Sequence, residues 1–385
     1  MFKKSLSLLL AAIMVCTITA CGSTSASATT NTTAAESKAT TNTTAAESKA
    51  TTDADTTIDT ATEGEATTTE TTDTTTAETT NTEAAETTDP NTTESTDTTT
   101  STATVSNTLA GDEDALVSTY ADQFEQLTYT DPETGLSITY NLYLPEDYDE
   151  TASYPMVVFI ADSSCAGRDA TSSLTQGLGA LVWATKEWQS VNPTIVAVPT
   201  YPETILDDHG SYTTTEYVEL TKKFIDYMSS EYAVDSERIY GTGQSMGCMT
   251  TLILASEYPD LYAACMFVDG QWDVSTLAGL EGQTFVYFAA EDDERAWAGA
   301  QEVMAMFDND AVSYSYAQWN GNWSPDELSS ATSELFTADE NQYFISWASG
   351  TIDASGSGMG GSSYHMASFD YAYNCIAVME WLFQQ

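Results

Sequence analysis

The chain has 385 residues, of which 58 are acidic and only 10 are basic, so its formal net charge at pH 7 is −48. A surface this acidic repels nucleic acid and anionic membranes, which argues against both as binding partners. With two histidines and no Cys-x-x-Cys pair, the composition predicts neither a metal centre nor a cofactor.

Residues 1–20 have the pattern of a signal peptide. Lys3 and Lys4 precede an apolar run over residues 6–15, which is too short to span a bilayer. The next residue is Cys21, and the letters I-T-A-C over residues 18–21 resemble a bacterial lipobox. The pattern predicts a cell-surface lipoprotein whose mature chain starts at a lipidated Cys21 and contacts the membrane only through that lipid.

Residues 21–108 consist almost entirely of Thr, Ala, Glu, Asp, Ser and Asn, and the sequence of residues 30–40 is repeated at 41–51. Such a segment buries too little apolar surface to offset its chain entropy, so we predict a disordered tether. The remaining residues, 109–385, form one expected domain. It has six basic and roughly forty acidic side chains, and we expect it to be monomeric.

Within the domain, strand-like and helix-like segments alternate. A hairpin is expected to join residues 123–130 to 135–144. Further strands are expected at 155–161, 194–198, 239–242, 264–268, 284–289, 313–319 and 343–348. Helices are expected at 178–189, 214–232, 249–258, 294–307 and 326–335, with a last amphipathic helix near the C-terminus. This alternation predicts an α/β fold: a mostly parallel sheet with helices on both faces and an antiparallel hairpin at its N-terminal edge.

The segment 243–247 reads G-Q-S-M-G and lies between a predicted strand and a predicted helix. This is the setting of a nucleophile elbow, in which Ser245 stands on a sharp turn flanked by glycines. A serine hydroxyl needs a basic partner, normally a histidine held by a carboxylate. His209 precedes Ser245, whereas His365 follows it on a glycine-rich loop before the last helix. The acid and the histidine that serve a nucleophile elbow follow its serine in the chain, so His365 is the candidate base.

The acid is expected between Ser245 and His365, just after a buried strand, because sites in open α/β sheets form at the carboxyl ends of strands. The acidic run 291–294 follows the strand at 284–289. Counting from the strand end favours Asp293, then Asp292, then Glu291. Asp269, which follows the preceding strand, is a further candidate.

Three segments carry a family resemblance: Y-G-T-G-Q-S-M-G at 240–247, D-G-Q-W at 269–272, and the C-terminal end from residue 365 onward. They resemble secreted bacterial esterases, which are α/β-hydrolases of the polyhydroxybutyrate-depolymerase and feruloyl-esterase type, akin to the prolyl-oligopeptidase catalytic domain. The resemblance implies an α/β-hydrolase fold and a triad of Ser245 as nucleophile, His365 as base and Asp293 as acid. Plant cell-wall acetyl or feruloyl esters are the substrates it suggests.

The resemblance also implies an oxyanion hole made by the N–H of Met246 and one N–H from the loop after an earlier strand. Ser163, in the loop over residues 161–165, is the chosen second donor. Many family members carry His-Gly at this strand end, whereas this chain has Ala161-Asp162, which places a carboxylate near the developing anion. The elbow also continues Gly247-Cys248 rather than Gly-Gly.

Aromatic and polar residues near predicted strand ends suggest a substrate pocket lined by Gln271, Trp272, Trp297 and Tyr364. Four cysteines fall in the domain, at 165, 248, 265 and 375. Secretion permits disulfides, and a bond between Cys165 and Cys248 would hold the oxyanion loop in place, but the default expectation is four buried free thiols.

Together these features predict a surface-anchored serine carboxylesterase that acts through an acyl-enzyme intermediate. Three alternatives remain open at this level: a peptidase with the same triad, an acyltransferase, or a surface-binding lipoprotein without catalytic activity.

Overall fold

The computed structural model describes residues 104–109, 111–355 and 363–385. The predicted signal peptide, Cys21 and nearly all of the predicted tether lie outside the described residues. None of the helices in the described part of the chain is long and apolar enough to cross a membrane.

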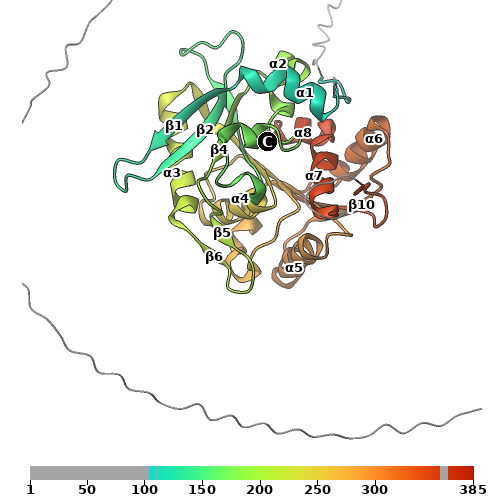
Figure 1. Cartoon of the computed structure of the whole chain (residues 1–385). Helices are drawn as coiled ribbons and strands as arrows, with labels where there is room; N and C mark the ends of the chain where they lie inside the picture. Colours follow the sequence, from blue (N-terminus) through green and yellow to red (C-terminus); the bar gives the residue numbers. More distant parts are fainter. Residues whose placement is uncertain (1–103, 110, 356–362) are drawn as a thin grey trace, which may run out of the picture. The chain divides into compact units, whose positions relative to one another are not determined.

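The described domain is built on a nine-stranded sheet with the strand order β1-β2-β4-β3-β7-β8-β9-β11-β10 (Figure 1). Its strands are β1 (Glu125–Thr130), β2 (Ser137–Tyr143), β3 (Tyr154–Ile160), β4 (Ile195–Thr200), β7 (Val234–Gln244), β8 (Ala264–Val268), β9 (Phe285–Ala290), β10 (Ser315–Trp319) and β11 (Gln342–Trp347). β2 pairs antiparallel with both β1 and β4, and the other pairings are parallel. The predicted α/β sheet with its N-terminal hairpin is therefore confirmed.

Helices cover both faces of the sheet because the inner strands are apolar on both sides. Along β3, for example, Met156 and Val158 belong to one buried cluster, and Val157 and Phe159 belong to the other. The first cluster packs against α3 (Glu216–Glu231), α4 (Met246–Glu257) and α5 (Glu294–Asp310). The second packs against α1 (Glu113–Tyr120), α2 (Lys186–Val191), α6 (Pro325–Leu335), α7 (Tyr364–Tyr373) and α8 (Ile376–Leu382).

The single helix predicted over residues 178–189 is wrong. The chain instead forms a short 3₁₀ turn (Val182–Ala184) and then α2. Thr185 separates them: its backbone is extended, and its hydroxyl accepts the N–H of Trp188 at 3.3 Å. A threonine whose side chain satisfies a free amide favours a new helix start over helix continuation.

The domain also begins slightly earlier than residue 109. Val105 is buried in the second cluster, and its N–H donates to Glu380 Oε1 at 2.7 Å. Asn107 donates to Asp326 Oδ1 at 2.6 Å. Residues 105 and 107 therefore contact the domain through one buried aliphatic side chain and two hydrogen bonds.

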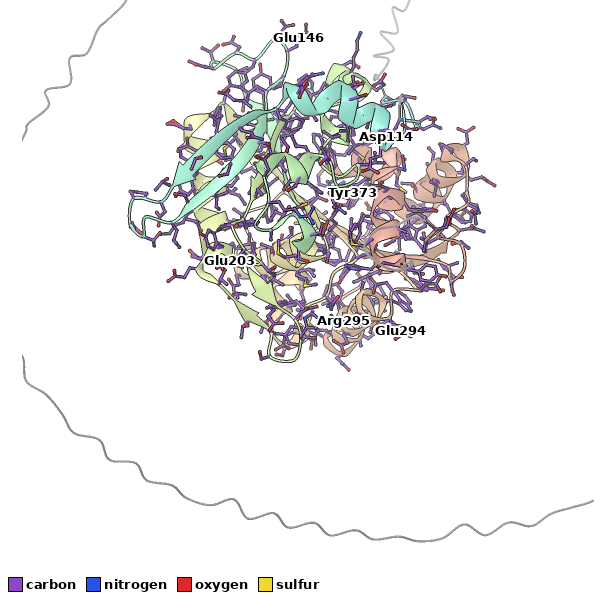
Figure 2. The ribbon with its side chains drawn as sticks, in the orientation of Figure 1. Asp114, Glu146, Glu203, Glu294, Arg295 and Tyr373 are labelled. Atoms are coloured by element: carbon purple, nitrogen blue, oxygen red, sulfur yellow. The ribbon has the colours of Figure 1, made fainter. Side chains whose placement is uncertain are left out.

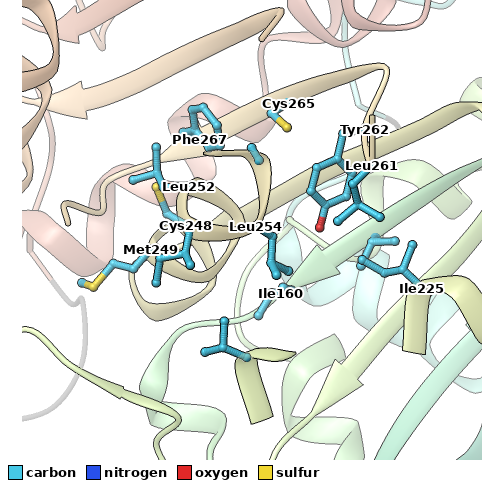
Figure 3. Packing of buried hydrophobic residues seen from close by; sticks show 14 of the residues in the cluster. Ile160, Ile225, Cys248, Met249, Leu252, Leu254, Leu261, Tyr262, Cys265 and Phe267 are labelled. Carbon is cyan, nitrogen blue, oxygen red and sulfur yellow. The ribbon is translucent and has the colours of Figure 1, made fainter. Parts of the chain in front are cut away.

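The sharp turn between β7 and α4 is possible because the backbone there packs without side chains. A Cβ on Gly247 would lie 1.8 Å from the carbonyl oxygen of Ile160 at the end of β3. Figure 3 shows Cys248, Met249, Leu252 and Leu254 of α4 in one buried cluster with Ile160 and Phe267. The first turn of α4 therefore lies directly against the end of β3.

We predict that Gly247→Ala lowers the free energy of unfolding by about 3 kcal/mol or more, because backbone atoms, which cannot rotate away, block the new methyl group. Gly282→Ala is the matched control, since a Cβ there meets nothing within 4 Å. Thermal or denaturant unfolding of the two variants checks this. Equal stability of both would contradict the close packing described here.

Candidate active site

Ser245 occupies the turn between β7 and α4 with φ 50° and ψ −116°, a backbone conformation that non-glycine residues rarely adopt. Two hydrogen bonds hold it there: its N–H donates to Val268 at 3.1 Å, and its carbonyl accepts the N–H of Met249 at 2.9 Å. The side chain is largely buried, and the residue lines a cavity. The turn thus fixes the hydroxyl in one position.

His365 lies in the first turn of α7, not on a loop as the sequence predicted. Ser363 caps this helix by accepting the N–H of Met366 at 3.3 Å, so the glycine-rich segment ends before the histidine. Helical backbone holds the imidazole more firmly than a loop would. Its Nε2 lies 2.8 Å from Ser245 Oγ.

Asp293 is the N-cap of α5, and its two carboxylate oxygens have different partners. Oδ1 accepts the N–H groups of Arg295 and Ala296, both at 3.3 Å, and Oδ2 lies 2.5 Å from His365 Nδ1. Because an ionised carboxylate only accepts, Nδ1 carries the proton and Nε2 is left to accept from Ser245. The structure therefore joins the three side chains in one hydrogen-bonded series.

The remaining carboxylates considered from sequence have hydrogen-bond partners other than His365. Asp292 accepts from Ser349 and Gly350, and Glu291 accepts from Gln318, Ser346 and Ser349. Both therefore hold the turn after β11 rather than the imidazole. β11 is the strand that precedes the His365 segment, while β10 forms the edge of the sheet. Asp269 is fully buried close to the site, but no hydrogen bond joins it directly to His365.

Opposing effects act on the pKa of His365. Burial lowers it, but the hydrogen bond to Asp293 and the negative charges of Asp293, Asp269 and Asp162 raise it, and the net pKa lies above the ordinary value of 6.5. The imidazolium form is thus stabilised by its surroundings, as a base that must hold a proton during a reaction requires.

The cavity in front of Ser245 has a volume of about 640 Å³. Of the four predicted pocket residues, only Gln271 lines it. The lining residues are Ser163, Thr204, Leu206, Asp207, Asp208, His209, Thr213, Thr214, Thr215, Ser245, Met246, Met249, Gln271, Asp293, Arg295 and His365. No phenylalanine, tyrosine or tryptophan of the described chain is among them, so the predicted Trp272, Trp297 and Tyr364 lie outside this lining.

The three aromatic residues predicted for the pocket have other surroundings. Trp272 is buried in the core and faces Tyr212, with 5.2 Å between ring centroids. Trp297 stacks on Tyr316 at 5.9 Å, and Tyr364 is exposed. Strand ends locate these residues along the sheet but do not determine which way each side chain points.

The residues that sequence reasoning missed lie on a small antiparallel hairpin, β5 (Leu206–Asp207) and β6 (Thr213–Thr214), and at the start of α5. Arg295, labelled in Figure 2 beside Glu294, donates from Nη2 to Asp208 Oδ2 at 2.6 Å. Asp208 also accepts from the side-chain amide of Gln271. One carboxylate thus ties the hairpin to the segment after β8 and to the first turn of α5.

A sequence signal for this network does exist. Arg295 is one of only six basic residues from residue 110 onward, and it follows the proposed acid by two positions. The letters D-D-H-G at 207–210 mark a turn. What the sequence does not show is that the two segments meet.

Asp207, Asp208 and His209 offer ligand atoms within 4.8 Å of one another, a spacing that a metal ion could use. Arg295, however, lies against the same cluster: its Nη1 is 3.3 Å from His209 Nε2, and its Nη2 binds Asp208. The guanidinium supplies the positive charge at this place, so we do not interpret the cluster as a metal centre.

Both predicted oxyanion donors line the cavity beside Ser245. Met246 is the first residue of α4, where amide N–H groups have no partner within the helix. Ser163 starts a 3₁₀ turn capped by Asp162, whose Oδ1 accepts the N–H of Ser164 at 2.8 Å. Asp162 Oδ2 accepts from Gln244 at 3.2 Å. Both oxygens of this carboxylate therefore have partners, although its negative charge still acts on His365.

The four cysteines of the described domain, Cys165, Cys248, Cys265 and Cys375, are buried free thiols. The disulfide considered between Cys165 and Cys248 is therefore not present. Cys248 packs against Gly270, where a Cβ would approach its sulfur to 2.8 Å. A small thiol at this position lets α4 lie close to the end of β8.

The parallel sheet, the serine on a strained strand-to-helix turn, and the adjoining histidine and aspartate define an α/β-hydrolase. Residues 132–333, more than half of the chain, match the family model described as "Putative esterase", and the chain belongs to this family. Membership places it among hydrolases of the carboxylesterase type.

Two curated relatives are each named acetylxylan esterase A. The protein from Emericella nidulans is 27% identical over 110 residues, which cover 24% of this chain and 36% of the relative. The protein from Aspergillus ficuum is 45% identical over 40 residues, which cover 10% of this chain and 13% of the relative. The chain thus spans about a third or less of the curated relatives it matches.

Among solved structures, the crystal structure of a thermostable esterase superposes with a TM-score of 0.54 and 26% identity. The match covers 69% of this chain and 64% of that one.

The pKa of His365 leads to a prediction about pH. Activity that needs a neutral imidazole should be lost as the pH falls through a pKa above 6.5, because the protonated form cannot accept from Ser245. The pH dependence of kcat/KM for a soluble ester measures this value in the free enzyme. A profile that stays flat down to about pH 4 would contradict His365 as the base.

Proposed function

We propose that this protein is a surface-anchored serine esterase in which Ser245, His365 and Asp293 are the catalytic triad. The observation that carries the proposal is the unbroken series of contacts in the cavity wall: Ser245 Oγ to His365 Nε2 at 2.8 Å, and His365 Nδ1 to Asp293 at 2.5 Å. Membership of the esterase family supports it.

The proposed reaction has two stages. Ser245 Oγ attacks the ester carbonyl while His365 Nε2 takes the hydroxyl proton, and the imidazolium then gives that proton to the departing alcohol. Water repeats the sequence on the acyl-enzyme and releases the acid. The N–H groups of Met246 and Ser163 are the proposed oxyanion donors, each contributing about 2.7–4 kcal/mol to the barrier reduction.

The cavity lining supports a small acyl group on a hydroxyl-rich alcohol. Threonine, aspartate, glutamine and arginine side chains surround the serine, and the described lining contains no tryptophan, tyrosine or phenylalanine ring on which a feruloyl group would stack. Of the acetyl and feruloyl esters considered from sequence, the lining favours acetyl esters of a polysaccharide. The names of the two acetylxylan esterase relatives agree with this choice.

The cellular setting is also a proposal. A lipid on Cys21 and the acidic segment up to residue 108 would hold the domain outside the cytoplasm and away from the membrane surface, where a large extracellular polymer is accessible. The same acidity disfavours binding to nucleic acid or anionic lipid. We expect a monomer without a cofactor.

We predict that Ser245→Ala lowers kcat for p-nitrophenyl acetate by about 10⁴-fold or more, because the triad residues act as a unit. Ser118→Ala, an exposed serine on α1, is the control and should leave turnover unchanged. The domain used should start before Val105, since this residue packs on the core. Equal turnover by the Ser245→Ala variant and the unmodified domain would refute the proposed nucleophile.

A second prediction concerns the alcohol part of the substrate. Arg295→Gln should lower the ratio of kcat/KM for an acetylated xylo-oligosaccharide to kcat/KM for p-nitrophenyl acetate by about tenfold, because a polar wall of the cavity loses its charged donor. Arg238→Gln is the control. It removes the same charge from a surface pair with Asp235, and Arg238 does not line the described cavity over Ser245. An unchanged ratio in Arg295→Gln would exclude this wall from sugar recognition.

A third prediction concerns the acyl part. The unmodified domain should hydrolyse acetyl esters with a kcat/KM about 100-fold or more above that for methyl ferulate, since no aromatic platform lines the described cavity. Paired initial-rate measurements on the two esters test this. A preference for the ferulate would show that the acyl group binds outside the lining described above.

A further inference from the structure

Asp269 is a buried carboxylate that the proposed mechanism does not use, although it lies beside the triad. It follows β8 directly, is fully inaccessible to solvent, and has a left-handed backbone with φ 44°. An aspartate in such a conformation and in such surroundings is costly, because a buried carboxylate loses its hydration and the backbone is strained. A position of this kind invites a functional explanation.

The two oxygens of Asp269 bind the two segments that carry the rest of the triad. Oδ1 accepts the N–H of Ala290 at 2.7 Å, at the end of β9 and three residues before Asp293. Oδ2 accepts the hydroxyl of Ser368 at 2.7 Å, on α7 and one turn after His365. One side chain therefore joins the acid-bearing segment to the base-bearing helix.

The charge of Asp269 is coupled to the same site. Burial, and then the neighbouring carboxylate of Asp293, raise its pKa to about 7, whereas His365 lowers it. Cys248, Tyr287 and Tyr373 are the other titratable groups near this charge. Burial, and to a smaller extent the charge of Asp269, raises the pKa of all three, so they stay protonated at neutral pH. The ionised form of Asp269 in turn raises the pKa of His365.

We propose that Asp269 is a positioning residue of the triad, a role that rests on the proposed esterase function. It sets α7 against the end of β9 so that His365 and Asp293 meet, and its negative charge stabilises the imidazolium that forms when Ser245 loses its proton. A carboxylate that only filled space in the core would do neither.

Two variants separate the effect of the Asp269 charge from the effect of its hydrogen bond to Ser368 on α7. Asp269→Asn keeps the size of the side chain and allows both hydrogen bonds, since the amide oxygen accepts from Ala290 and the amide N–H donates to Ser368. It removes only the charge. Ser368→Ala breaks the link to α7 and keeps the charge. Asp370→Asn is the matched control: this aspartate is half-buried on α7 and also accepts an amide N–H, from Leu178 at 2.7 Å, but it contacts none of the triad.

The first measurement is the proton affinity of His365, followed by NMR of the imidazole resonances. The chain contains only two histidines, and the other one, His209, is exposed. We expect Asp269→Asn to lower the proton affinity of His365 about threefold or more, and Asp370→Asn to leave it unchanged. This readout does not depend on any esterase activity.

The second measurement is the pH dependence of ester hydrolysis. Asp269→Asn should lower kcat about 10- to 100-fold with little change in KM, and the acidic limb of kcat/KM should move to lower pH. Ser368→Ala should lower kcat without moving that limb. Asp370→Asn should retain kcat even if its melting temperature falls.

The outcomes are distinguishable. If folded Asp269→Asn keeps both the wild-type His365 titration and the wild-type kcat, the positioning role is overturned. Equal losses of kcat in Asp269→Asn and Asp370→Asn without a shifted titration would likewise reduce Asp269 to a structural residue. If Asp269→Asn does not fold, an unchanged kcat in Ser368→Ala overturns the link to α7. An unmodified domain with no hydrolytic activity but a shifted titration in Asp269→Asn would instead refute the proposed function.

Discussion

The geometry of the site depends on how closely the first turn of α4 approaches β3. Gly247 lies against the carbonyl of Ile160 with no room for a methyl group, and this contact determines where the elbow places Ser245. Because β3 leads directly into the loop containing Ser163, the same contact brings the amides of Met246 and Ser163 to one cavity. Main-chain hydrogen bonds to Val268 and Met249, not the side chain of Ser245, hold its backbone in the strained conformation.

The site also requires that one particular carboxylate contacts the imidazole of His365, although the acidic run 291–294 contains four carboxylates. The chain does this by giving each a separate structural role at the carboxyl ends of β8 and β9. Asp293 caps α5 with one oxygen and faces His365 with the other, while Glu291 and Asp292 bind the turn after β11. Helix capping orients the Asp293 carboxylate at no extra cost in ordering, because the cap is needed by α5 in any case.

Much of this was readable from the sequence, because the features concerned are local. The glycines around Ser245, the apolar strands and the order serine, acid, histidine each depend on neighbouring residues. The cavity wall was not readable, because the hairpin containing Asp208 meets Arg295 and Gln271 across the fold. The glycines before His365 predict a loop, whereas the structure has a helix that begins directly after the Ser363 cap. Direction of side chains, as for Trp272 and Trp297, is likewise set by long-range packing.

Labelling of the folded domain with a fluorophosphonate, followed by peptide mass spectrometry, tests the central claim most directly. Such a probe forms a stable bond only with a serine that a neighbouring base activates. The account predicts a single adduct on Ser245, which forms more slowly as the pH falls and His365 becomes protonated. A folded domain that remains unlabelled, or one labelled at a different residue, would contradict it.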